Sequence, residues 1–174
     1  IYRWDEGNVT VSIDARNFEK AAQSALVTGE KEVLCHACSL YYGEFLSQMT
    51  GEKWVNVIGV KYQELYFKCL RLVSRLLKAD REYDRLLNLS TAASKLYPYE
   101  ECQMMKLDCL IALKRYQEAM EVYKQVVVQY FEEQGLPPSE TMLQRFRLMS
   151  GQIRYTSDML KDIENTLKER EETQ

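Results

Sequence analysis

The sequence predicts an all-α fold of about seven to eight helices, arranged as antiparallel pairs and preceded by a short N-terminal β-hairpin. Two observations support this fold class. From Asp14 onward, apolar residues recur every three or four positions, which is the period of a helix with one buried face. Residues 9–13 instead alternate between apolar and polar side chains, as hairpin strands do, and nothing later offers a strand to pair with them.

These patterns divide the chain into three parts. Residues 1–13 form the predicted hairpin, and because a lone two-stranded hairpin is marginal in water, we expect it to be the remnant of a sheet in a preceding domain. Residues 14–149 are expected to form one helical domain. Residues 150–174 are rich in charge and read as a polar linker helix that could lead to a further domain.

Composition excludes several classes of protein. The 174 residues are 46% hydrophobic and 28% charged, which is enough apolar material for one buried core. No apolar run reaches the roughly 18 residues of a membrane span, and the first residues do not resemble a signal peptide. The formal charge of -3 gives no overall basic field for a nucleic acid backbone. Because the chain begins with Ile1, we expect it to be a segment of a longer protein.

Residues that usually carry catalysis are scarce. The single histidine, His36, removes most His-based acid–base pairs and zinc enzymes, so we expect neither enzyme activity nor a cofactor. The 5 cysteines are an odd number, which favours reduced thiols in the cytoplasm. Cys35 and Cys38 have the spacing of a redox or metal pair, but no second pair follows, and core cysteines are the favoured interpretation. An enzyme with Cys35 as nucleophile is the weakest alternative.

Start and stop signals predict the first three helices. Asp14 is expected to cap a helix that Gly29 ends, and a second helix is expected to run up to Gly43. A third begins at Trp54 and continues for about seven turns, on the order of 39 Å. Its predicted inward stripe comprises Trp54, Val57, Ile58, Tyr62, Leu65, Cys69, Leu72, Val73 and Leu76.

Three helices with short links follow, and they contain an internal repeat. Four positions recur 33 residues apart, close to the period of about 34 in tetratricopeptide helix pairs. The paired positions are Tyr83 and Tyr116, Leu86 and Ala119, Ser90 and Tyr123, and Ala93 and Val126. Pro98 falls where that motif places its terminal proline. A capped start at Ser139 predicts one more helix, and beyond Gly151 only a thin apolar stripe remains.

Several blocks of residues occur in a specific order and spacing between residues 1 and 149. They are Tyr2, Trp4, Asp14 and Phe18; the run Leu40-Tyr41-Tyr42-Gly43-Glu44-Phe45-Leu46; Trp54; Tyr97-Pro98-Tyr99-Glu100; Arg115-Tyr116-Gln117-Glu118-Ala119 with Tyr123; and Glu133-Gln134-Gly135-Leu136-Pro137-Pro138-Ser139. Together they resemble the bacterial transcriptional activator domain, the tetratricopeptide-like region that follows the winged helix in antibiotic regulatory proteins. One departure is the turn Leu113-Lys114-Arg115, which lacks the usual glycine, so we expect it to be tighter or shifted.

The resemblance implies a cytoplasmic transcriptional regulator in which this domain is non-catalytic and acts by protein contact or self-association. The implied partners are a second copy, which would give a homodimer, RNA polymerase, or a neighbouring domain. DNA would be contacted only through a preceding winged-helix domain, of which residues 1–13 are the hairpin and whose recognition helix this sequence lacks. No membrane contact is expected.

One helix face stands out as a candidate binding site. Lys68, Arg71, Arg75 and Lys78 lie at offsets of 3, 7 and 10 and share one face of the long helix. If Tyr83 and Tyr116 are equivalent repeat positions, these residues fall where tetratricopeptide repeats line their groove, beside Met104, Asp108 and Ile111. A groove with one basic wall could hold an acidic peptide, a phosphate-bearing ligand or an acidic segment of the same protein. The alternative interpretation is a solvated face. The second candidate function is therefore a stand-alone tetratricopeptide adaptor that binds an acidic peptide or segment.

Overall fold

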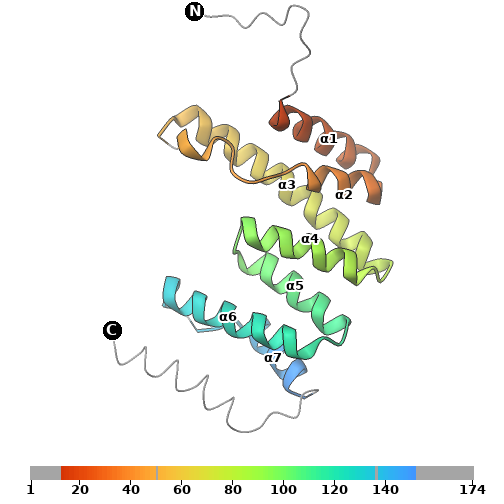
Figure 1. Cartoon of the computed structure of the whole chain (residues 1–174), viewed down its shortest axis with the longest axis vertical. Coiled ribbons are helices and arrows are strands. Elements are labelled where there is room, and N and C mark those ends of the chain that lie inside the picture. The colour runs from red at the N-terminus through yellow and green to blue at the C-terminus, as the bar shows by residue number, and fades with distance from the viewer. Residues whose placement is uncertain (1–12, 50, 136, 152–174) are drawn as a thin grey trace, which may run out of the picture. The chain divides into compact units, whose positions relative to one another are not determined.

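The computed structural model describes residues 13–49, 51–135 and 137–151, and every regular element in these ranges is helical (Figure 1). The helices are α1 (Asp14–Thr28), α2 (Lys31–Ser39), the short 3-10 helix η1 (Ser47–Met49), α3 (Lys53–Ala79), α4 (Tyr83–Leu96), α5 (Glu100–Ala112), α6 (Tyr116–Gln134) and α7 (Glu140–Ser150). The all-α prediction is confirmed for these ranges. The hairpin expected over residues 1–13 lies outside them except for Ile13, as does all but the start of the linker helix expected over 150–174.

Contacts divide the chain into two compact units, Ile1–Glu82 and Tyr83–Gln174. The described helices α1, α2 and α3 belong to the first unit, where each packs against the other two. Helices α4 to α7 belong to the second unit, where each packs on the next and α7 also contacts α5. None of the described helices is both long and apolar enough to cross a membrane.

Helix α1 begins one residue earlier than predicted, because its cap is the residue before Asp14. Ile13 is the N-cap residue, and its carbonyl accepts a hydrogen bond from the Asn17 amide at 3.0 Å. Asp14 is already helical, and its Oδ1 accepts from the amide of Ala15 at 2.7 Å. The predicted role of Asp14 as the cap is therefore wrong, although an acidic residue in the first turn still suits the helix dipole. Gly29 ends α1 as predicted, with the left-handed φ of 66° that glycine adopts without strain.

Helix α2 ends at Ser39, well before the predicted stop at Gly43. The chain leaves the helix so that Tyr41, which is 8% exposed, can enter the interior of the first unit. Its ring stacks on that of Tyr66, with centroids 4.4 Å apart, and lies 4.9 Å from the ring of Phe18. Burial of this aromatic cluster outweighs the local helical pattern of the segment.

Helix α3 has the predicted length, but its buried face differs from the predicted stripe. Tyr62, Cys69 and Val73 are buried as expected. At the start of the helix, Val55 is buried instead, while Trp54 and Val57 are 50% and 70% exposed. The first two turns carry apolar residues on every side, so periodicity alone cannot select the face that packs.

The second unit is built around a core that gathers residues from α5, α6 and α7. The buried members are Leu107, Leu110, Ala119, Met120, Tyr123, Val126, Val127, Met142 and Met149. The repeat found in the sequence has a structural counterpart, because Tyr83 and Tyr116 each begin a helix. The other three pairs of repeat positions are buried in both copies.

The turns that precede α4 and α6 have the same backbone geometry. Arg81 and Lys114, which are also 33 residues apart, have left-handed φ values of 58° and 59°. In each turn the following amide reaches back to the helix, from Glu82 to the Leu77 carbonyl at 2.9 Å and from Arg115 to the Leu110 carbonyl at 2.8 Å. This is the Schellman arrangement of a helix end, in which glycine is the usual left-handed residue. The turn before Tyr116 is therefore an ordinary one with lysine in the glycine position.

Replacing Lys114 with glycine is expected to raise the free energy of unfolding by about 0.5–1 kcal/mol. A left-handed non-glycine residue costs roughly 1–2 kcal/mol, and the greater freedom of glycine in the unfolded chain returns roughly 0.5–1 kcal/mol of that gain. Urea denaturation followed by circular dichroism measures the difference. Lys95→Gly is the matched control, because Lys95 is exposed in the last turn of α4 and its change should destabilise the protein. A Lys114→Gly protein less stable than the parent would contradict this prediction.

Candidate functional site

The loop between α2 and α3 encloses a small pocket in the first unit. The pocket has a volume of about 190 Å³. It is lined by Asp14, Ala15 and Phe18 of α1, by residues 40–46 of the loop, and by Tyr62 of α3. The run Leu40 to Leu46, which carries part of the family resemblance, therefore forms one side of the pocket.

The pocket loop is anchored from inside by an aromatic residue. The ring of Phe45 packs edge-on against Tyr62 at 5.4 Å and against Trp54 at 6.4 Å between centroids. Two residues near Phe45 have positive φ values, 134° at Gly43 and 47° at Leu46. Only glycine adopts the first value without strain, which explains why Gly43 occupies that position. The loop therefore has a defined shape set by Phe45 and Gly43.

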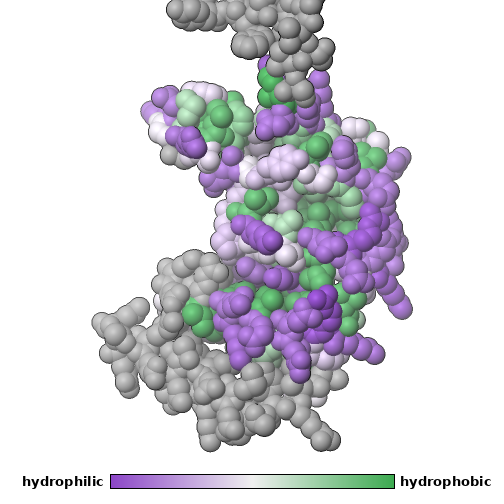
Figure 2. All heavy atoms as spheres, in the orientation of Figure 1, coloured by the Kyte–Doolittle hydropathy of each residue, from purple (hydrophilic) through white to green (hydrophobic). Residues whose placement is uncertain are grey.

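Four large apolar side chains are exposed on this loop and at the start of α3, next to exposed polar residues such as Glu44 and Gln48. Tyr42 is 77% exposed, and Leu46, Met49 and Trp54 are exposed as well. We name these four residues the loop patch. Figure 2 shows green and white side chains among purple ones where η1 and the start of α3 lie. Large apolar side chains gathered on one surface element are typical of an interaction site, whereas scattered ones are normal.

A polar group borders the pocket residue Tyr62. The Lys61 Nζ lies 2.5 Å from Glu19 Oε1, and the Tyr62 hydroxyl donates to Glu19 Oε2 at 3.3 Å. The hydrogen bond from Lys61 lowers the pKa of Glu19, so this carboxylate is ionised at neutral pH. Burial, followed by the charge of Glu19, raises the pKa of Tyr62, which keeps the phenol protonated. These contacts connect α1 to α3. Their side chains keep the same charge near neutral pH, so none of them is suited to act there as a catalytic base.

The four predicted basic residues of α3 lie on the surface of the first unit. Lys68, Arg71, Arg75 and Lys78 are all exposed, as their shared helix face predicts. The guanidinium of Arg71 also sits over the ring of Phe67, 5.6 Å from its centroid, which orients this side chain along the helix.

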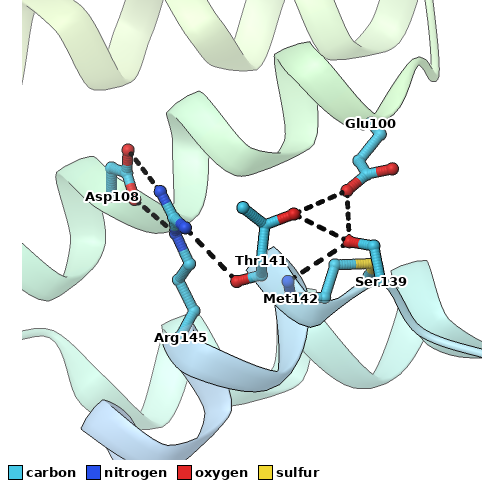
Figure 3. Close-up of polar contacts among 6 residues, drawn as sticks. All are labelled: Glu100, Asp108, Ser139, Thr141, Met142 and Arg145. Atoms are coloured by element: carbon cyan, nitrogen blue, oxygen red, sulfur yellow. Dashed lines mark hydrogen bonds and ion pairs between the residues drawn. The ribbon is translucent and has the colours of Figure 1, made fainter.

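The three other predicted groove residues lie in the second unit, on α5. Met104 and Ile111 are partly buried and pack against the core of that unit. Asp108 forms an ion pair with Arg145 of α7, with Nε 2.9 Å from Oδ1 and Nη2 3.4 Å from Oδ2 (Figure 3). All three side chains therefore have contacts within their own unit that hold α5, α6 and α7 together.

A second polar contact fastens the start of α7. Ser139 is the N-cap of that helix, accepting from the Met142 amide at 3.3 Å and donating to Glu100 Oε1 at 2.5 Å. Thr141 Oγ1 lies 3.0 Å from the same serine hydroxyl, and its carbonyl accepts from Arg145 (Figure 3). Two of the family blocks thus meet through Glu100 and Ser139. Sequence reasoning did not single out Arg145 or Thr141, since their partners are about 40 residues away and no local pattern marks them.

The remaining predicted motif residues lie either in the links between helices or in α6. Pro98 separates α4 from α5, where the rings of Tyr97 and Tyr99 stack 5.4 Å apart. Gly135 follows α6 with φ of 62°, and Pro138 precedes the cap of α7. Tyr116, Ala119 and Tyr123 are the repeat positions of α6 described above.

The cysteines behave as core residues in the described part of the chain. Cys38, Cys69, Cys102 and Cys109 are buried, and Cys35 is partly buried. Burial raises the pKa of Cys38 above its usual range and that of Cys69 to about 11, so neither thiol ionises near neutral pH. Within residues 13–49, 51–135 and 137–151, no group of three or more His, Cys, Asp or Glu residues could hold a metal ion.

The fold and these surfaces define an all-α domain of packed helix pairs that presents an apolar loop and a basic helix face. The sequence model of the family described as the bacterial transcriptional activator domain matches residues 13–148. The chain belongs to this family, and residues 13–148 form a domain of the kind found in bacterial transcriptional regulators. This confirms the resemblance seen in the sequence. No curated protein and no solved structure matches the chain.

Proposed function

We propose that this domain is a non-catalytic protein-interaction module that self-associates through the loop patch. By pairing two copies of a transcriptional regulator, it positions attached DNA-binding domains. DNA contact belongs to a winged-helix domain outside this sequence, and the site of action is the cytoplasm, where bacterial transcription takes place. The helix pairs with their 33-residue offset are those of a tetratricopeptide-like scaffold, which acts through its surfaces rather than through bound cofactors.

The loop patch is the observation that carries this proposal. Tyr42, Leu46 and Met49 expose apolar surface between α2 and α3, and Trp54 exposes it in the first turn of α3, next to the ring of Phe45 that sets the shape of the loop. A preshaped apolar surface loses little conformational entropy on binding, so its burial against a second copy favours association.

Light scattering across a concentration series tests this proposal. The wild-type chain is expected to gain mass with concentration, whereas the double variant Tyr42→Glu/Met49→Glu is expected to remain a monomer. Val27→Glu/Leu148→Glu is the matched control, because Val27 and Leu148 are 87% and 61% exposed but lie on other helices. It adds the same charge and should associate like the wild type. A wild-type chain that stays monomeric throughout, or equal loss of association in both variants, would contradict self-association through the loop patch.

A second candidate function is the adaptor role for an acidic partner. The exposure of all four basic residues on α3 favours it. This function and self-association use different residues, so one chain can carry both.

A further inference from the structure

The exposed side of α3 carries one continuous stripe of residues along nearly the whole helix. The stripe comprises Trp54, Val57, Lys61, Glu64, Lys68, Arg71, Arg75 and Lys78, and we name it the α3 stripe. Its members are spaced alternately by three and four residues, and all are exposed. In a coiled coil, the positions at which two helices contact each other have the same average spacing of about 3.5 residues. From Trp54 to Lys78 the stripe is about 36 Å long at 1.5 Å per residue.

The chemistry of the stripe changes from one end to the other. It begins with the apolar side chains of Trp54 and Val57, whereas its last four residues are all basic. Glu64 is its one acidic member, and Lys61 is paired with Glu19 of α1. The helix dipole favours basic residues in the last turn, which accounts for Lys78 alone. The other basic residues of the stripe lie too far from the end of α3 for that explanation.

We propose that the α3 stripe binds an amphipathic helix of a partner protein whose contact face is apolar at one end and acidic at the other. The helical spacing of the stripe matches a helical partner, and its apolar end supplies an anchor. The guanidinium groups of Arg71 and Arg75 match carboxylates, which they can bind with two parallel hydrogen bonds. The proposal rests on the protein-interaction function above; its surface shares Trp54 with the loop patch but extends along α3 to Lys78, and its partner is a different protein.

Charge argues against a second copy as the occupant. In an antiparallel pair of α3 stripes, the basic end of each would face Trp54 and Val57 of the other, which offer it no carboxylate. In a parallel pair, the two basic halves would face each other and repel. The apolar end likewise argues against a nucleic acid backbone, because phosphates would contact only the basic half and leave Trp54 and Val57 in water.

Fluorescence anisotropy with labelled synthetic helices tests the proposal on the purified chain. The probe carries leucine at the first two positions of a heptad stripe and glutamate at the last four. The comparison peptide has the same composition distributed over all faces of the helix. The first peptide is expected to bind at least about tenfold more tightly than the comparison peptide. Only in the first peptide do the leucine and glutamate side chains lie on one face, so that all of them can contact the α3 stripe at the same time. Equal binding of the two peptides would overturn the proposal, as would a DNA duplex that binds more tightly than the first peptide.

Variants of the chain test which residues are used. Arg71→Glu/Arg75→Glu is expected to weaken binding of the first peptide by about tenfold or more, and Arg71→Gln/Arg75→Gln by less. Lys20→Glu/Lys95→Glu is the matched control, because both lysines are exposed on other helices and the charge change is the same. Val57→Asp should weaken binding through the apolar end. Undiminished binding in the glutamate and glutamine variants, or equal loss in the lysine control, would overturn the proposal.

The two proposals fail separately in these measurements. The arginine variants leave the loop patch intact and should self-associate like the wild type. Loss of peptide binding with normal association shows that the basic end of the α3 stripe acts separately from the loop patch. Failure of the wild-type chain to self-associate would remove the homodimer and leave the stripe to be judged by peptide binding alone.

Discussion

Replacing Tyr41 with alanine is expected to lower the free energy of unfolding of the first unit by about 3 kcal/mol, in the range measured when large buried aromatic residues are truncated. Tyr41 follows α2 and fills the space between the rings of Phe18 and Tyr66. Its removal leaves a cavity that α1 and α3 cannot fill without moving. Urea denaturation followed by tryptophan fluorescence measures the change, since Trp54 belongs to this unit.

The neighbouring residue supplies the control for this experiment. Tyr42 is 77% exposed, so at concentrations where the chain is a monomer Tyr42→Ala should change the free energy of unfolding by no more than about 0.5 kcal/mol. Adjacent tyrosines with the same side chain thus separate the effect of burial from that of residue type. Equal effects of the two changes would show that the ring cluster does not hold the unit together.

Replacing Leu107 with alanine is expected to have a comparable effect on the second unit, about 3 kcal/mol. Leu107 is fully buried in the core that joins α5, α6 and α7. Loss of its side chain weakens the packing of three helices at once, and hydrogen exchange should report faster exchange of amides in α5 and α6. Leu148→Ala is the control, because Leu148 is exposed on α7. A Leu107→Ala protein as stable as this control would contradict the assigned core.

Much of the helical architecture could be predicted because its signals are local. The stop at Gly29, the length of α3 and the cap at Ser139 each depend on residues close in sequence. The end of α2 could not be predicted, since it depends on the rings of Phe18 and Tyr66 that receive Tyr41. Tertiary packing overrode the local helical pattern there.

The candidate surfaces were predictable to different degrees. Helical offsets place Lys68, Arg71, Arg75 and Lys78 on one face, and the structure shows that face exposed. The exposure of Trp54 could not be predicted, because apolar residues occur on every side of the first two turns of α3. The partner of Asp108 is Arg145, which lies 37 residues away. No local pattern in one sequence predicts a contact over that separation.

The matching turns at Arg81 and Lys114 restrict how the length of this protein can change during evolution. Each turn starts a helix whose buried positions are counted from that start, with Ala119 and Tyr123 following Tyr116. Deleting one residue from α6 between Tyr116 and Ala119 rotates the rest of that helix by about 100° and turns its buried face away from α5. Insertions and deletions within residues 83–123 are therefore expected to be rare among homologues.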